Sequence, residues 1–231
     1  MGNSRTVIEW TEATWNPASG CTKVSAGCKY CYAERLWPRL SAPGQPYAGR
    51  RFTDVKLHPE RLAEPRGWRR PRMVFVNSMS DLFHLDIAET YIAEVLRVIT
   101  ETPRHTFQIL TKRPERLAAF SPFPPNAWVG VSVENHEEAA RRVDLLAETE
   151  ARVRFLSCEP LLEPLDLRPW LPLLQWVIVG GETGAKARRM EPEWAADVLA
   201  QCRAAGVPFF MKQMSRKAPI PPTLMVREFP A

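Results

Sequence analysis

Short apolar runs alternate with amphipathic stretches from Met73 onward. The runs are six or seven residues long and rich in Val, Ile, Leu and Phe, at residues 73–79, 106–112, 127–133, 153–159, 176–182 and 208–213. Near-continuous apolar runs are typical of strands buried on both faces, which occur in parallel sheets. Between the runs, residues 87–100, 137–148 and 193–205 have the spacing of amphipathic helices; in the last, Trp194, Val198 and Cys202 share one face.

One more strand is expected before Cys21, which brings the total to six or seven β/α units. We therefore predict an α/β fold, a partial TIM-like barrel of parallel strands in a single domain over residues 1–231. A doubly wound open sheet has the same periodicity and is the alternative. Residues 38–72 break the alternation, because they are rich in Pro, Gly and Arg, and we interpret them as an ordered insertion or lid.

Polar residues follow the same end of each apolar run. In a parallel barrel the carboxyl ends of the strands form the active site, so repeated polar endings favour a functional mouth over ordinary loop polarity. The endings are Ser80-Asp81, Thr111-Lys112, Glu134-Asn135, Ser157-Cys158-Glu159, Gly180-Gly181-Glu182 and Lys212-Gln213.

Strand parity separates the side chains of the 153–159 run into two sets. Phe155, Ser157 and Glu159 share one face, and Leu156 and Cys158 share the other. If Glu159 faces the barrel axis, Cys158 packs against the helices as a small apolar residue. We expect the same of Cys202, on the apolar face of its helix.

Length and composition suit one globular domain, with 231 residues and 45% hydrophobic content. No apolar stretch approaches the ~20 residues that span a bilayer. The first residues lack the apolar core of a secretory signal, so we expect a cytoplasmic protein. The start, MGNSRT, fits the loose pattern for N-terminal myristoylation, a short match that needs a eukaryotic host.

The formal net charge is +5, with arginine pairs at 50–51, 69–70, 141–142 and 188–189. A basic balance favours polyanionic partners, and the guanidinium group is well shaped for phosphate. The alternative is a solvated surface balanced by the 26 acidic residues. We expect the arginines of residues 50–72 to contact a phosphate-bearing substrate.

Cys21, Cys28 and Cys31 lie within eleven residues, in WNPASGCTKVSAGCKYCYAERL. Such clustering in a cytosolic protein indicates metal or redox chemistry rather than disulfides. Thiolates suit zinc or an iron–sulfur cluster, and three cysteines leave a cubane one ligand short of four. A structural zinc site is the alternative, with His58 or His84 as the fourth ligand, although neither has zinc-finger spacing.

The segment Cys28-Lys29-Tyr30-Cys31 resembles the C-x-aromatic-C half of the radical S-adenosylmethionine (SAM) signature, placed as there between a first strand and a helix. The wider chain is similar to a phage- and bacteria-encoded, radical-SAM-like family of unassigned activity. The matching segments are TWNPASGCTKVSAGCKYCYAER, NSMSDLFH, QILTKRPERL, WVGVSVEN, RFLSCEPLLEPL, WVIVGGETG and VPFFMKQ.

This resemblance implies a partial β/α barrel with a [4Fe–4S] cluster on Cys21, Cys28 and Cys31. It also implies an electron donor, and reductive cleavage of SAM to a 5′-deoxyadenosyl radical that acts on an unidentified substrate. Two features depart from the common signature. Six residues separate the first two cysteines instead of three, and Gly180-Gly181-Glu182 follows about the sixth run rather than the second.

From the resemblance and the strand ends we assign expected roles. Tyr30, Ser78, Asp81, Glu134, Gly180 and Gly181 are expected to contact the cofactor. Lys112, Glu159, Glu182 and Lys212 are expected to line the mouth as catalytic residues. A plain structural ion pair between Glu159 and a lysine is the alternative for that carboxylate.

Three functions are compatible with these residues. The first is a radical SAM enzyme that acts on a nucleotide or nucleic acid. The second is a zinc-stabilised nucleic-acid-binding module without catalysis, and the third is a hydrolase that uses the carboxylates of the mouth. No Walker loop, G-x-G-x-x-G or Ser/His/Asp signature supports phosphoryl transfer or nicotinamide chemistry.

Overall fold

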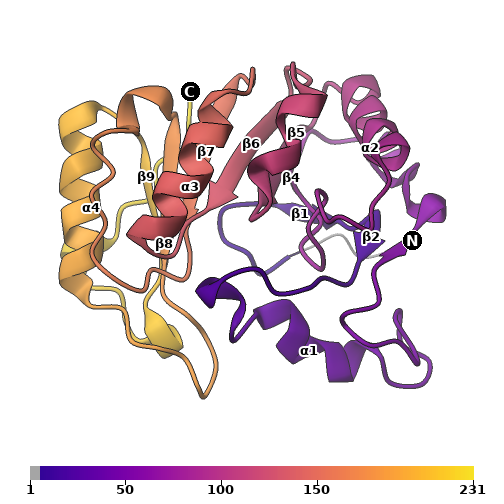
Figure 1. Cartoon of the computed structure of the whole chain (residues 1–231), viewed down its shortest axis with the longest axis horizontal. Coiled ribbons are helices and arrows are strands. Elements are labelled where there is room, and N and C mark those ends of the chain that lie inside the picture. The colour runs from indigo at the N-terminus through magenta and orange to yellow at the C-terminus, as the bar shows by residue number, and fades with distance from the viewer. Residues whose placement is uncertain (1–5) are drawn as a thin grey trace.

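Seven parallel strands form a curled half-barrel sheet in the computed structural model, which describes residues 6–231. Most of the MGNSRT pattern lies outside these residues. The strands are adjacent in chain order (Figure 1): β1 (Ala13–Trp15), β4 (Met73–Val76), β5 (Thr106–Thr111), β6 (Ala127–Ser132), β7 (Val153–Cys158), β8 (Trp176–Gly180) and β9 (Phe209–Gln213).

This strand order decides between the two predicted architectures. A doubly wound sheet reverses direction at a switch point, so that strands distant in sequence become neighbours. Here each strand pairs with the next one along the sheet, for example Trp128 of β6 with Val153 of β7. The prediction of a partial α/β barrel is confirmed.

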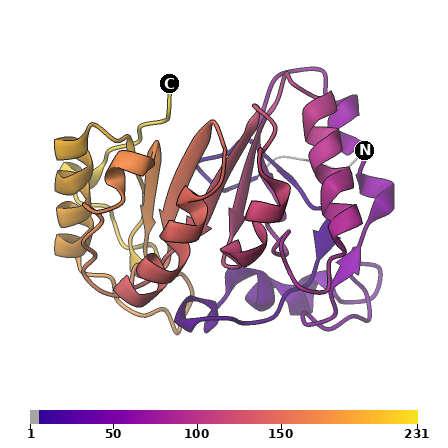
Figure 2. The ribbon, with the colours of Figure 1, turned by 45° about the horizontal axis from the view of Figure 1, so that its top comes forward.

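Helices cover one side of the sheet: α2 (Glu89–Glu101), α3 (His136–Ala147) and α4 (Pro192–Ala205), as Figure 2 shows. All three lie close to the segments predicted as helices. Helix α3 begins after Asn135, whose side chain accepts a hydrogen bond from the Glu138 N–H (2.9 Å). Helix α4 is followed by Gly206, which takes the left-handed conformation (φ 68°) that favours glycine.

The two faces of the sheet bury different sets of side chains. The main core lies between the sheet and the helices and contains Leu156 and Cys158 of β7. Phe155 points the other way, into a smaller aromatic cluster with Trp10 and Trp176. The parity predicted for this strand is therefore confirmed. Cys158 and Cys202 are both fully buried in the main core, as expected.

The connection from β1 to β4 contains α1 (Tyr32–Leu40) and a short antiparallel pair of β2 (Ala18–Ser19) with β3 (Lys56–Leu57). Because β1 and β4 are parallel, this connection must return the chain from the carboxyl edge of the sheet to its amino edge. Residues 58–72, between β3 and β4, make that return.

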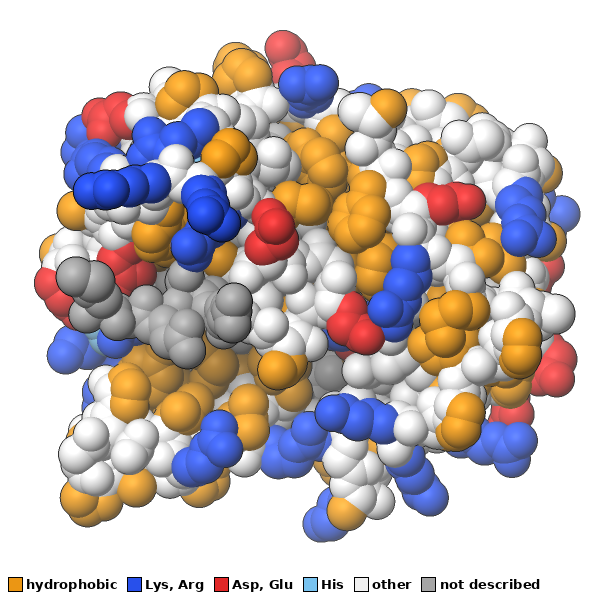
Figure 3. Space-filling model, turned by 180° about the vertical axis from the view of Figure 1, so that it is seen from behind, with side chains coloured by type: hydrophobic (Ala, Val, Ile, Leu, Met, Phe, Trp, Pro, Cys, Tyr) orange, Lys and Arg blue, Asp and Glu red, His pale blue; other side chains and the backbone are white. Residues whose placement is uncertain are grey.

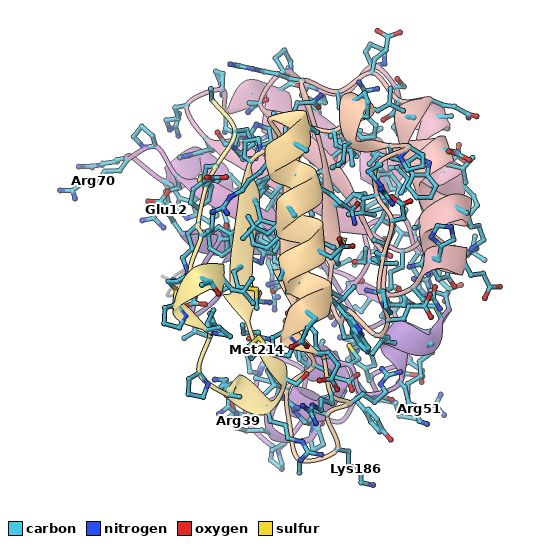
Figure 4. The ribbon with its side chains drawn as sticks, turned by 90° about the vertical axis from the view of Figure 1, so that its left-hand side faces the viewer. Glu12, Arg39, Arg51, Arg70, Lys186 and Met214 are labelled. Atoms are coloured by element: carbon cyan, nitrogen blue, oxygen red, sulfur yellow. The ribbon has the colours of Figure 1, made fainter. Side chains whose placement is uncertain are left out.

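The return places the later arginines of the 50–72 segment far from the strand ends. Arg66 pairs with Glu101 at the end of α2 (2.6 Å), and the Arg72 carbonyl accepts the N–H of Thr106 at the start of β5. Figure 4 shows Arg70 projecting away from the end that carries Arg39 and Lys186. The arginines of residues 66–72 therefore lie away from the mouth, and their contact with a phosphate-bearing substrate stays a prediction. In the described part of the chain, no helix is long and apolar enough to cross a membrane.

Candidate functional site

A cleft of about 350 Å³ opens at the carboxyl ends of the strands, on the side of the sheet that the helices leave free. Its floor is apolar, with Trp10, Phe75 and Leu110. Figure 3 views the molecule from this side, opposite to Figure 1. The residues predicted from the sequence that line the cleft are Tyr30, Cys31, Lys112, Glu159, Gly181, Glu182 and Lys212.

Two carboxylates of the cleft are held by cations. The Lys212 Nζ lies 2.6 and 2.8 Å from the two carboxylate oxygens of Glu159, and the Gln213 side-chain amide donates to the same group (3.2 Å). Glu182 accepts from the Arg188 guanidinium, with a shortest distance of 2.6 Å, and from its backbone N–H (2.9 Å). The cleft wall therefore presents paired charges rather than a lone acid.

Gly180 and Gly181 allow close packing at the end of β8. A Cβ on Gly180 would lie 3.2 Å from the carboxyl carbon of Glu159, and one on Gly181 would lie 2.3 Å from the Ser215 backbone nitrogen. The absence of a side chain thus lets Glu159 and the turn after β9 approach this strand.

The cysteine loop, residues 21–31, lies at the same edge of the sheet. Cys28 ends a 3₁₀ turn (Ala26–Cys28), and Cys31 directly precedes α1 and lines the cleft. Gly20 pairs with Ser80 after β4, which fixes the start of the loop beside the strand ends. Cys21, Cys28 and Cys31 are all free thiols of intermediate exposure.

The three thiols are not gathered around one point. Among the described residues, no three acidic, histidine or cysteine side chains are close enough to hold a metal ion. The Cys21 sulfur lies 3.5 Å from Arg113 Nη1, and the Cys28 sulfur lies 3.9 Å from the Ser25 hydroxyl. Burial, followed by the Asp81 carboxylate, raises the pKa of the Cys21 thiol to about 11. Coordination by this thiol must therefore displace a proton.

Three thiols from one loop are donors that an iron–sulfur cluster can use when a cofactor takes its fourth iron, whereas a structural zinc ion needs a fourth protein ligand. Arg113 supplies positive charge beside Cys21. Both predicted fourth zinc ligands already have hydrogen-bond partners, although His84 lies next to the cysteine loop. The Nε2 of His84 bonds to the Thr22 hydroxyl (2.8 Å) and its Nδ1 accepts from the Asp86 N–H. His58 bonds to Ser19 (2.7 Å) and Glu60.

Glu134 binds the backbone of the cysteine loop from the sheet. Its side chain is fully buried at the end of β6 and accepts from the Gly27 N–H (2.8 Å) and from Arg142 Nη1 of α3 (2.9 Å). Burial alone would raise the pKa of Glu134, but Lys112, Arg142 and these hydrogen bonds outweigh it and hold the pKa below its usual value. An ionised Glu134 thus connects the sheet, α3 and the loop.

Asp81 and Ser78 lie beside the loop rather than along the cleft. Asp81 accepts from the Thr111 hydroxyl (2.7 Å) and the Lys112 N–H (3.0 Å), and it lies 3.4 Å from Arg113, which contacts Cys21. The Ser78 carbonyl accepts the hydroxyl of Tyr32 in α1. Asp81 therefore positions Arg113 beside Cys21, and Ser78 positions Tyr32 at the start of α1, directly after Cys31.

Three arginines of the site were not among the predicted site residues. Arg113 directly follows Lys112 at a polar strand end, so extending that pattern by one residue would have found it. Arg142 and Arg188 were noted only as members of arginine pairs, and the sequence did not indicate that they would pair with Glu134 and Glu182.

Comparisons with known proteins agree with this geometry. The family model described as "Protein of unknown function (DUF5131)" matches residues 5–221. No curated protein matches the chain. Two solved structures share the fold. Spore photoproduct lyase, as a mutant in which serine replaces one cysteine, superposes with a TM-score of 0.55 at 10% identity, covering 89% of this chain and 76% of its own. The same lyase complexed with dinucleoside spore photoproduct gives 0.51 at 12% identity, covering 87% and 76%.

Proposed function

Because the chain belongs to the DUF5131 family, whose description assigns no activity, we propose its function from the site: a radical SAM enzyme with a [4Fe–4S] cluster on Cys21, Cys28 and Cys31. The observation that carries this proposal is the position of the cysteine loop. It lies at the carboxyl mouth of a parallel half-barrel, and Cys31 lines the cleft.

The shared fold supports the proposal. The half-barrel matches that of spore photoproduct lyase, a radical SAM enzyme, over most of this chain. A cluster with three protein ligands and SAM would supply one-electron cleavage of a carbon–sulfur bond. A nucleotide or nucleic acid is the proposed substrate class, consistent with the dinucleoside bound to the lyase.

The protein's own residues would orient the cofactor and exclude water. The apolar floor of Trp10, Phe75 and Leu110 suits a flat adenine ring, and Tyr30 closes the cleft beside Cys31. We propose that Gly181 leaves room for the methionyl part of SAM. Glu159 and Glu182, each paired with a cation, would accept hydrogen bonds from its amino group or ribose.

The remaining predicted residues take supporting roles. Lys112, directly after β5, and Lys212, in β9, line the cleft and would offer ammonium groups to the carboxylate of SAM or to substrate. Glu134, Asp81 and Ser78 are positioning residues, because they hold the cysteine loop and its neighbours rather than facing the cleft.

Anaerobic purification with an iron and sulfide assay tests the proposal. We expect a brown protein with about four irons per chain that cleaves SAM after reduction with dithionite. Cys21→Ser, Cys28→Ser and Cys31→Ser should each lose the cluster, while Cys202→Ala, in the core far from the loop, should keep it. A colourless protein with one zinc per chain would contradict the proposal and leave the zinc-stabilised binding module.

A further inference from the structure

Basic side chains surround the mouth of the cleft. This mouth rim consists of six exposed residues that form no ion pair with another described residue: Lys29, Arg35, Arg39, Lys186, Arg216 and Lys217. The acids nearby are already matched, since Glu34 pairs with Lys23, Glu182 with Arg188 and Glu191 with Arg189. The rim therefore carries a surplus of positive charge.

The rim is one continuous surface built from four segments. Arg35 of α1 donates to the Thr183 side chain (3.1 Å), and Arg188 donates to the Ala26 carbonyl of the cysteine loop (3.0 Å). The Arg216 N–H, in the turn after β9, donates to the Glu182 carbonyl (2.9 Å). Figure 4 places Arg39 and Lys186 at the same end, and Figure 3 shows Lys and Arg side chains along its lower edge.

The turn after β9 holds the backbone of its two basic residues, Arg216 and Lys217, in a strained conformation. Arg216 (φ 56°) and Lys217 (φ 59°) are successive non-glycine residues in the left-handed region, which L-residues with a side chain rarely adopt. Lys217 also lines the cleft. Strain of this kind concentrates at functional sites, where it fixes the direction of a side chain.

Aromatic rings lie between these cations. The Tyr30 ring has the Lys29 ammonium and the Arg188 guanidinium each 5.5 Å from its centroid, and Tyr32 is 39% exposed. Cations along a path with interleaved aromatic rings are typical of proteins that bind single-stranded nucleic acid, because phosphates meet the cations while bases stack.

We propose that the mouth rim binds the sugar–phosphate backbone of a single-stranded nucleic acid and presents one base at a time to the cleft. The inference rests on the proposed function, because it names the substrate class of the same site. The charges are spread over four exposed segments, which suits an extended polyanion rather than a free nucleotide. An unpaired base enters the cleft without the cost of leaving a duplex stack.

Fluorescence anisotropy with a labelled 20-nucleotide single strand tests this inference on the anaerobically purified protein. The rim variant is Arg39→Glu with Lys186→Glu. The matched control is Arg69→Glu with Arg70→Glu, an equal change of charge on exposed residues away from the mouth. We expect the rim variant to bind about tenfold or more weakly, and its slope of log K against log salt to be about 1.4 less steep. The control should stay within about threefold of the unsubstituted protein.

Equal losses in the two variants would overturn the inference, since net charge alone would then explain binding. Equal or tighter binding of a 20-base-pair duplex would overturn the choice of a single strand. Iron content is measured on the same samples, so that the two proposals fail separately. Rim-dependent binding by a protein without a cluster contradicts only the radical chemistry, and a loaded cluster without rim dependence contradicts only this inference.

Discussion

At Gly27 the cysteine loop approaches a buried carboxylate more closely than any side chain would allow. A Cβ there would lie 2.8 Å from both the Cδ and the Oε1 of Glu134, whose side chain is fixed by Arg142. We predict that Gly27→Ala lowers the free energy of unfolding by about 1–3 kcal/mol, the usual cost of overpacking, and reduces iron bound per chain. Urea titration and an iron assay measure the two effects.

Gly67 is the matched control for this substitution, because a Cβ there meets no atom within 4 Å. Gly67→Ala should change stability by less than about 0.5 kcal/mol and leave the iron content unaltered. Similar behaviour of the two variants would show that contact with Glu134 does not constrain the loop.

The pair of Glu159 and Lys212 is where a catalytic role and a structural role predict different outcomes. The side chains are only 20% and 15% exposed, so removing either partner leaves a largely buried charge and is expected to lower stability whatever the role of the pair. We predict that Glu159→Gln and Lys212→Met each lower SAM cleavage per cluster at least ~10-fold, in addition to any fall in the urea midpoint. Unchanged cleavage per cluster with a lower midpoint would favour the plain ion pair.

At the scale of elements, α3 carries two adjacent arginines in contrasting surroundings. Arg142 is fully buried against Glu134, whereas Arg141 is 46% exposed and pairs at the surface with Glu115 and Glu138. We predict that Arg142→Leu costs about 3–5 kcal/mol, because it leaves the buried Glu134 without its partner on α3. Arg141→Leu should cost at most about 1 kcal/mol. Urea unfolding of the two variants measures the difference.

The strands could be predicted from the sequence because a strand buried on both faces needs a continuous run of apolar residues. The alternation of side chains along the 153–159 run then predicted that Cys158 packs in the core. The residues that contact the cysteine loop could not be predicted from the sequence. Glu134 is 107 residues from Gly27, and only the closing of the sheet brings them together. Glu134 was expected from its strand end to contact a cofactor, and the sequence carries no sign of its role beneath the loop.

At the scale of the whole molecule, the parallel arrangement explains why basic segments separate. A chain that leaves the carboxyl edge after β1 must return to the amino edge before β4, so the arginines on the return cannot stay at the mouth. Composition alone cannot distinguish Arg39 from Arg70, yet the fold places them far apart. Only the topology therefore tells which part of the net charge of +5 faces the cleft.

The stability of the whole molecule should depend on pH through its buried histidines. His58, His84 and His105 are each almost fully buried, and burial is the main cause that lowers the pKa of all three below the ordinary value. The unfolded chain therefore binds more protons than the folded one as the pH falls below about 6.5. We predict that the free energy of unfolding is highest above that pH and declines from pH 7 to pH 5.

Urea midpoints at pH 7, 6 and 5 measure this decline, in a range where carboxylates of ordinary pKa stay ionised in both states. His105 is the best single test, because it lies at the amino edge of the sheet, away from the cysteine loop, with its Nε2 3.2 Å from the Pro65 carbonyl. His105→Gln removes the titrating group while keeping a donor, so its midpoint should fall less between pH 7 and pH 5 than that of the unsubstituted protein. An identical decline in both would show that His105 titrates alike in the folded and unfolded chains.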